Sequence, residues 1–269
     1  MQVEATAAKP RVRTVIDHLA ATGRYHFTAA EMRSALGVSG AASKLALRRL
    51  IKKRQVASPA RGFYVIVPPE YRSLGCLPAD QFIPALMEHR EIRYYAALLS
   101  AAQYHGAAHQ RPQEFQVALA RNRRPIVCGA VRASFLARQR ISAVPLQRFN
   151  TPRGTILVST PEATAVDLVG YERRAGGLHH VATVLSELAA RIDPDRLVIA
   201  VQTAPVSWAQ RLGYLLELVG AADRVMPLKE YVQRRARQST ALVPTFARLH
   251  TSCSGDWRLR INADVEPDT

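Results

Sequence analysis

Few residues of this sequence have the types and spacing that catalysis requires. Glu162 and Asp167 are the only acidic pair that looks positioned, but a spacing of five puts their side chains on different faces of a helix. The sequence contains no GxxxxGK[ST] phosphate loop, no GxGxxG, no HExxH and no GxSxG turn. It also has no Gly-Ser dipeptide, which leads the acidic motif of nucleotidyltransferases. We therefore expect a binding protein without catalytic residues rather than an enzyme.

The sequence also gives little support for a metal site or for redox chemistry. His105 and His109 stand four residues apart, but Gly106 breaks the helix that would align them, and no third ligand is evident. Cys76, Cys128 and Cys253 are odd in number and far apart, which argues against a disulfide framework or a CxxC metal site. We expect reduced cysteines that serve as small core residues, no metal and no cofactor.

The chemistry that the sequence does favour is the binding of phosphate by positive charge. Residues 1–70 carry 12 Lys+Arg against 4 Asp+Glu, and residues 111–153 carry 9 Arg against Glu114 alone, so each block has a net charge of +8. Together they account for the whole net charge of +16. Concentrated positive charge is typical of proteins that bind nucleic acid, because each neutralised phosphate releases condensed counterions.

Length and hydrophobicity indicate a folded, water-soluble protein. The chain has 269 residues, 48% of them apolar, which is enough for a sizeable core and one or two domains. No stretch approaches the roughly 18 to 20 uninterrupted apolar residues of a membrane span, and the N-terminus lacks a signal-peptide core. We expect a cytoplasmic protein without a membrane partner.

The first basic block has the pattern of a winged helix-turn-helix. Apolar spacing predicts a helix over residues 11–21, and Thr28 with Glu31 has the spacing of a capping box for a second helix. Ser39 is the expected N-cap of a third helix over residues 41–53, which carries a cationic face opposite an apolar one. A β-hairpin over residues 55–67, with Arg61 at its tip, would be the wing.

A cationic third helix is suited to the major groove, and a tip arginine to the minor groove or a phosphate. We expect double-stranded DNA as a partner. The predicted DNA-binding residues are Ser39, Ala41, Ser43, Lys44, Arg48, Arg49, Lys52, Lys53 and Arg61.

Pro68-Pro69 ends the wing, so we expect a DNA-binding domain over residues 1–72 and a second domain over residues 73–269. The second domain should begin with an alanine-rich helix, Ile92 to His105, followed by a series of short strands. Ser159 and Glu162 have capping-box spacing for the first of several late helices. The predicted fold class is α+β: an N-terminal winged helix-turn-helix, then a mixed α/β domain with a basic sheet and late helices.

The second basic block falls on the predicted strands and their turns, which suggests a sheet with one cationic face. The predicted members of this basic face are Arg121, Arg123, Arg124, Arg132, Arg138 and Arg140.

Three segments of the sequence resemble a known family. They are the stretch from Tyr94 to Gly106 (YYAALLSAAQYHG), the stretch from Val158 to Leu168 (VSTPEATAVDL), and the stretch from Arg211 to Glu217 (RLGYLLE). In this order, behind a basic winged helix, they resemble the AbiEi antitoxins of type IV toxin-antitoxin (abortive infection) systems.

This resemblance implies a protein of two parts. The N-terminal module of such proteins binds inverted repeats at the promoter of its own operon and represses it. The C-terminal domain counteracts a nucleotidyltransferase toxin, generally without a stable complex, and the second basic block would fit that antitoxin role. The alternative is a transcriptional regulator whose C-terminal domain only dimerises or senses a ligand.

Overall fold

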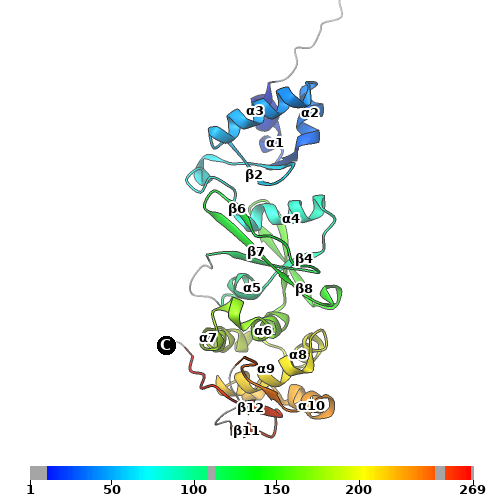
Figure 1. Ribbon diagram of the computed structural model, residues 1–269, viewed down its shortest axis with the longest axis vertical. Coiled ribbons are helices and arrows are strands. Elements are labelled where there is room, and N and C mark those ends of the chain that lie inside the picture. Colours follow the sequence, from blue (N-terminus) through cyan, green and yellow to red (C-terminus); the bar gives the residue numbers. More distant parts are fainter. Residues whose placement is uncertain (1–10, 108–112, 246–251, 268–269) are drawn as a thin grey trace, which may run out of the picture. The chain divides into compact units, whose positions relative to one another are not determined.

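A computed structural model describes residues 11–107, 113–245 and 252–267 of the chain. The chain divides into two compact units (Figure 1). The N-terminal unit consists of Met1–Ile92, Arg124–Ser134 and Asn150–Ile156, and the C-terminal unit consists of Arg93–Arg123, Phe135–Phe149 and Leu157–Thr269. Each unit is therefore built from segments that are distant in the sequence.

The N-terminal unit begins with three helices and a three-stranded antiparallel sheet. The helices are α1 (Val12–Ala21), α2 (Ala29–Leu36) and α3 (Gly40–Lys52). The sheet has the order β1-β3-β2 and is formed by β1 (His26–Thr28), β2 (Val56–Ala60) and β3 (Phe63–Ile66). The three helices and the β2–β3 hairpin follow the order that the sequence pattern predicts, whereas β1 was not predicted.

Local capping explains why the helices begin and end where they do. The Thr28 hydroxyl accepts from the Glu31 backbone N–H, and the Glu31 carboxylate accepts from the Thr28 N–H, so the predicted capping box is present. Partial burial raises the pKa of Glu31, but hydrogen bonds from Arg24 and Thr28 outweigh it and hold the pKa at about 2. Gly37 ends α2 with a positive φ of 58°, and the Ser39 side chain caps α3 by accepting from the Ala42 N–H.

A small apolar core holds these elements together. Ile16 of α1, Met32 and Leu36 of α2 and Leu47 of α3 pack with the strand residues Phe27, Val56 and Ile66. A core of this size leaves most of α3 exposed.

Later segments complete the N-terminal unit. They are η1 (Pro69–Tyr71), α4 (Ala79–His89), and the antiparallel hairpin of β6 (Ile126–Cys128) and β7 (Val131–Ala137), of which β7 runs on into the C-terminal unit. The Arg153 guanidinium lies 3.5 Å from the Tyr25 ring centroid and pairs with Glu70, so residues 150–156 also contact this unit.

Six strands form one mixed sheet in the order β6-β7-β5-β4-β9-β8. The central strands are β4 (Tyr94–Ala96), β5 (Phe115–Leu119) and β9 (Gly154–Ser159), and β8 (Leu146–Thr151) lies at one edge. β4 is antiparallel to β5 and parallel to β9. The predicted series of strands between residues 114 and 158 is confirmed.

Most helices of the C-terminal unit follow the sheet in sequence, and Figure 1 shows α6 to α10 gathered together. They cover an extensive core of alanine, valine and leucine side chains. The helices of this unit are α5 (Leu98–Tyr104), α6 (Pro161–Gly170), α7 (Leu178–Leu188), α8 (Pro194–Val201), α9 (Val206–Leu218) and α10 (Met226–Arg235).

A second three-stranded sheet, of order β10-β12-β11, is formed by β10 (Thr240–Ala241), β11 (Ser252–Ser254) and β12 (Leu259–Ile261). Trp257, next to this sheet, is fully buried and packs against Gly213 of α9. A Cβ atom at Gly213 would lie 2.0 Å from the Trp257 ring, so only glycine allows this approach. The Trp257 indole N–H also donates to Glu217 at 2.7 Å.

Two local predictions are wrong. Ile92 to His105 is not one helix, because Tyr94–Ala96 pairs with β5 and β9 and only Leu98–Tyr104 is helical. The N-cap of α6 is Thr160 rather than Ser159: Thr160 accepts from the Ala163 N–H, whereas the Ser159 hydroxyl bonds Thr164. The overall prediction of a mixed α+β fold with late helices is confirmed.

The boundary between the compact units differs from the predicted division after residue 72. Residues up to Ile92, and the two later segments, belong to the N-terminal unit. Residues 1–72 as a separate DNA-binding domain remain a prediction. Among the described residues, no helix is long and apolar enough to cross a membrane.

The contact of Gly213 with Trp257 gives a first test of the C-terminal unit. Gly213→Ala should lower the free energy of unfolding by about 1–3 kcal/mol, because the new methyl group overlaps the indole. Gly255→Ala is the matched control, since a Cβ there meets nothing within 4 Å. Urea unfolding followed by Trp fluorescence measures both, and equal stability of the two variants would contradict this packing.

Candidate functional site

The outward face of α3 is a strip of exposed cations. Lys44, Arg48, Arg49 and Lys52 are exposed there, and Lys53 follows at the C-cap. Ala41 is exposed near the N-terminus of the helix, so the backbone is accessible at that end. The strip also contains Leu45, whose side chain is 51% exposed. These residues can contact phosphates and base edges together because they lie on one face of one helix.

Two residues of α3 differ from the sequence prediction. Ser43 is only 3% exposed and lies on the same face as the buried Leu47, so it is not available to the floor of a DNA groove. A helical wheel at 100° per residue predicts that Ile51 lies on the apolar side with Leu47 and Leu50, but its side chain is 38% exposed. Ser39 remains exposed, although its hydroxyl is used to cap the helix.

Arg61 lies where the hairpin prediction puts it. Ala60 pairs with Phe63, so Arg61 and Gly62 form a two-residue turn, with Gly62 at a φ of +78°. The Ser58 hydroxyl donates to Ala60 and Phe63 carbonyls next to this turn. The exposed Arg61 side chain therefore projects from a hairpin tip whose backbone is held by hydrogen bonds.

A hollow of about 380 Å³ lies beside the N-terminal turns of α2 and α3. Its lining includes Arg33, Lys44, Ser43 and Tyr64. Arg33 is exposed and adds a cation from α2 to those of α3. Sequence reasoning did not select Arg33, because the cationic face was sought on the third helix alone.

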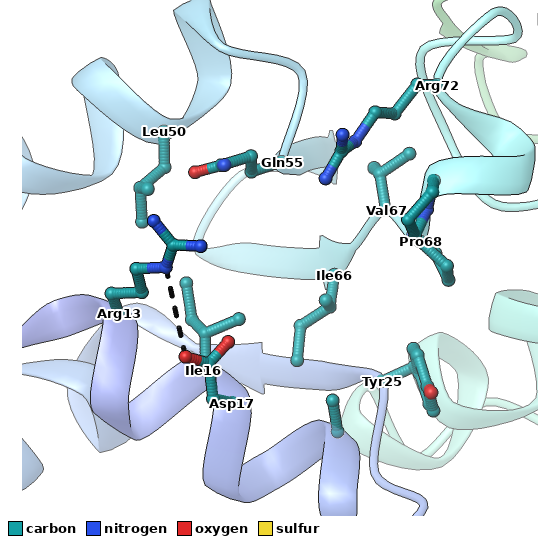
Figure 2. A pocket seen from close by; sticks show the side chains of 12 residues that line it. Arg13, Ile16, Asp17, Tyr25, Leu50, Gln55, Ile66, Val67, Pro68 and Arg72 are labelled. Atoms are coloured by element: carbon teal, nitrogen blue, oxygen red, sulfur yellow. Dashed lines mark ion pairs between the residues drawn. The ribbon is translucent and has the colours of Figure 1, made fainter.

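Figure 2 shows a second hollow of the N-terminal unit, of about 270 Å³, lined by α1, the end of α3, β3 and the segment after it. Ile16, Leu50 and Ile66 form its apolar part. Arg13 on its rim pairs with Asp17 at 3.9 Å. This rim therefore carries both signs of charge, unlike the face of α3.

The second basic block does not form the predicted face of a sheet. Arg121, Arg123 and Arg124 lie in the loop between β5 and β6, and Arg140 lies in a turn after β7, all exposed. Of the six predicted residues only Arg132 is an exposed strand residue. Arg124 and Arg132 belong to the N-terminal unit and the other four to the C-terminal unit.

Arg138 is a correction to the predicted basic face, because it is buried. Its side chain is 2% exposed, and its Nε donates to the Asp167 carboxylate at 2.8 Å. Its two terminal nitrogens donate to the carbonyl and hydroxyl of Thr203 at 2.9 and 3.0 Å. Arg138 therefore joins β7, α6 and α8 inside the C-terminal unit and offers no charge to a partner.

The Asp167 carboxylate is the centre of this buried network. It is fully buried on α6, and the Tyr95 hydroxyl of β4 donates to its second oxygen at 2.7 Å. Complete burial raises the pKa of Asp167, while Arg138 and the Tyr95 hydrogen bond act in the opposite direction. Burial and the Asp167 charge together raise the pKa of Tyr95, so the phenol stays protonated as a donor.

The other residues considered for chemistry also have structural partners. Glu162 is buried and accepts from the Asp193 backbone N–H at 3.1 Å, at the beginning of α8. The ring of the buried His105 bonds the Ser159 carbonyl at 2.7 Å, and burial lowers its pKa. His109 lies outside the described residues. Within the described residues no three His, Cys, Asp or Glu side chains lie together as a metal site would require.

The three sequence segments that resemble the AbiEi family build the core of the C-terminal unit. The first supplies Tyr95, the second supplies Asp167, and the third, in α9, supplies Gly213 and Arg211, whose Nε donates to the Ala241 carbonyl. The three segments are separated in sequence, but residues from each of them, among them Tyr95, Val166 and Leu212, lie in one apolar core cluster.

Comparison with solved structures shows a known fold. The crystal structure of the RV2827C protein from Mycobacterium tuberculosis matches with a TM-score of 0.65 and 18% sequence identity, covering 96% of this chain and 95% of that chain. At this identity the match shows the fold. No curated protein matches the chain.

Residues 95–218 match the family described as the AbiEi antitoxin C-terminal domain. The matched range runs from Tyr95 of β4 to Leu218, the end of α9. The resemblance to the AbiEi-type antitoxins is thereby confirmed for this part of the chain. The match supports a role as an antitoxin in a toxin-antitoxin system, with a toxin as its functional partner.

The buried pair of Arg138 and Asp167 should be a large contributor to stability. Asp167→Asn leaves the guanidinium buried without its counter-charge, so we expect a loss of about 3–5 kcal/mol in the free energy of unfolding. Asp223→Asn is the control, because Asp223 pairs with Arg224 at 3.0 Å but is 71% exposed, and such pairs contribute at most about 1 kcal/mol. Urea unfolding at neutral pH compares the two; a small loss in Asp167→Asn would show that the network is not needed.

Proposed function

We propose that this chain is a DNA-binding autorepressor and the antitoxin of a type IV toxin-antitoxin system, and that it opposes a nucleotidyltransferase toxin. The match of residues 95–218 to the AbiEi antitoxin C-terminal domain carries the antitoxin part of this proposal. The exposed cationic strip of α3 supports the DNA-binding part.

The order of elements in the N-terminal unit supports a winged helix-turn-helix, in which α2 and α3 are the helix-turn-helix and β2 and β3 the wing. In this arrangement α3 enters the major groove. Lys44, Arg48 and Arg49 would then meet base edges and phosphates, while Lys52 and Lys53 meet the backbone at the helix end. Arg61 at the hairpin tip would reach the next minor groove or a phosphate.

Arg33 extends this interface to the neighbouring helix. It shares a hollow with Lys44, so a phosphate between α2 and α3 would meet two cations. If Ser43 does not contact DNA, recognition of the base sequence would depend on the longer side chains of α3.

A DNA-binding experiment tests the role of α3. Arg48→Ala should weaken binding to the DNA upstream of the operon by about 1–3 kcal/mol if Arg48 reads a base, and should relax sequence preference at that position. Arg173→Ala, an exposed arginine of the C-terminal unit, removes the same charge outside the proposed interface. Fluorescence anisotropy at one fixed salt concentration compares the variants on operator and unrelated DNA.

The result discriminates between kinds of contact. If Arg48→Ala loses the same binding free energy on both DNAs, Arg48 contacts a phosphate rather than a base. If Arg173→Ala weakens binding as much as Arg48→Ala does, the effect comes from net charge alone. Unchanged binding by Arg48→Ala would contradict the proposed docking of α3.

The exposed arginines of the second block are candidates for the antitoxin action. Arg121, Arg123 and Arg124 are exposed in one loop, and loops carry function more often than the elements that they connect. Arg132 is exposed on β7. Since a type IV antitoxin opposes its toxin without a stable complex, these arginines would act by engaging the RNA target of the nucleotidyltransferase or nearby DNA.

A charge reversal tests this assignment. Replacing Arg121, Arg123, Arg124 and Arg132 together by Glu should abolish rescue of growth when the chain is co-expressed with the neighbouring toxin gene. The fold should be unchanged because all four side chains are exposed, and a thermal unfolding curve checks this. Two double variants assign the loss of rescue to one unit. Arg121→Glu with Arg123→Glu changes the C-terminal unit, and Arg124→Glu with Arg132→Glu changes the N-terminal unit.

Arg173→Glu with Arg235→Glu is the matched control, since both are exposed arginines outside the block. Full rescue by the fourfold variant would show that the block is not used. No toxicity of the neighbouring gene, or no rescue by the wild-type chain, would favour a transcriptional regulator whose C-terminal domain only dimerises or senses a ligand.

A further inference from the structure

Two of the three cysteines lie against each other in the N-terminal unit. Cys76, just before α4, is completely buried, and its thiol is hydrogen-bonded to that of Cys128, the last residue of β6. Cys128 is partly exposed, and both thiols are free. The pair is unrelated to the predicted DNA-binding residues and to the family segments, so neither role accounts for it.

The backbone fixes this juxtaposition. The Ala130 N–H donates to the Leu74 carbonyl at 2.8 Å. A Cβ atom at Gly129 would lie 2.1 Å from that same carbonyl oxygen and 3.0 Å from the Gly75 Cα. The two backbones therefore meet at glycines in the left-handed region, φ 70° at Gly75 and 60° at Gly129. Cys76 and Cys128 are the residues next to these glycines, so the meeting of the backbones holds their side chains together.

The environments of the two sulfur atoms are different. The Cys128 sulfur accepts hydrogen bonds from the Cys76 thiol and from the Ser58 backbone N–H of β2, and these lower the pKa of Cys128 despite its partial burial. The hydrogen bond to Cys128 and burial raise the pKa of Cys76. Cys128 is therefore the thiol that ionises first and that a small oxidant can reach, with Cys76 held next to it as a second thiol.

We propose that Cys76 and Cys128 form a reversible disulfide site that is oxidised by a hydroperoxide. The Cys128 thiolate attacks one peroxide oxygen, so that an S–O bond forms, the O–O bond breaks, and hydroxide leaves when the oxidant is hydrogen peroxide. The Cys76 sulfur then attacks the sulfenic sulfur of Cys128 and its thiol proton leaves with the displaced oxygen as water. In total, two thiols and one hydrogen peroxide give one disulfide and two waters, and a dithiol reductant reverses the oxidation.

This reactivity suits a reducing compartment. Disulfides in cytosolic proteins are usually transient and redox-sensing, and a pair of a reactive and a resolving cysteine is the usual form of such sites. The proposal does not depend on DNA binding or antitoxin action, because it rests only on the contacts of the two thiols and the adjoining backbone.

Peptide mapping of the full-length protein tests the site. The reduced chain is treated with hydrogen peroxide, free thiols are alkylated, and the digest is examined by mass spectrometry. We expect a linked peptide containing Cys76 and Cys128, with a loss of about 2 Da relative to the reduced pair, that disappears with dithiothreitol. Cys253→Ser is the control and should form the same link, since Cys253 lies on β11 in the C-terminal unit.

Trapping with dimedone assigns the two roles. In Cys76→Ser, the sulfenic acid on Cys128 has no resolving thiol and should be labelled several-fold more than Cys76 is in Cys128→Ser. Cys76→Ala repeats the first measurement without a buried hydroxyl, and circular dichroism checks the fold of each variant.

Three results would overturn the proposal, and the first two come from the wild-type chain alone. They are a disulfide that is only intermolecular, oxidation of Cys128 to sulfinic acid without any link to Cys76, and faster labelling of Cys76 than of Cys128.

Discussion

The fold of the C-terminal unit depends on ion-pair and hydrogen-bond partners for one buried carboxylate, that of Asp167. Asp167 is entirely removed from solvent, and an isolated carboxylate there would be strongly unfavourable. Arg138 and Tyr95 compensate it, and each brings its own element: Arg138 follows the end of β7, and Tyr95 lies in β4. Thr203, just after α8, accepts from both terminal nitrogens of the guanidinium. A sheet and two helices are thus held to one arrangement by hydrogen bonds that purely apolar contacts would not specify.

The family match includes this buried arrangement, since Tyr95, Arg138 and Asp167 all lie within residues 95–218. The segments shared with the AbiEi domain supply the ion network, the close approach of α9 to Trp257, and the helix start at Thr160. They determine how the unit folds. The exposed arginines lie in loops or, for Arg132, on the exposed side of β7, where substitutions cost little stability and contact with a partner is possible.

Features that depend on near neighbours in the sequence could be predicted from it. The capping box of Thr28 and Glu31, the Ser39 cap, the Arg61 turn and the strands between residues 114 and 158 all follow from local spacing.

Features that are decided by partners distant in the sequence could not be predicted from it. Tyr94–Ala96 has helical neighbours in sequence, yet pairing with β5 and β9 makes it a strand. Arg138 looks like its cationic neighbours until Asp167, 29 residues later, is placed beside it. The cationic face of α3 was predictable from one helix, whereas the position of Arg33 beside Lys44 and the burial of Ser43 required the packing of two helices.

The N-terminal unit has a consequence for how the chain is made. Its elements up to Ile92 are synthesised first, but the β6–β7 hairpin that meets Leu74 and Gly75, and Arg153 that stacks on Tyr25, come later in the same chain. A nascent chain on the ribosome can form the small core around Phe27 and Leu47 early, since its members all precede residue 67. The N-terminal unit cannot fold completely until residue 156 has been translated. By then almost all residues of the six-stranded sheet, β4 to β9, have been synthesised. Completion of the first unit is therefore tied to synthesis of the sheet that begins the second, and the two units mature together rather than in sequence.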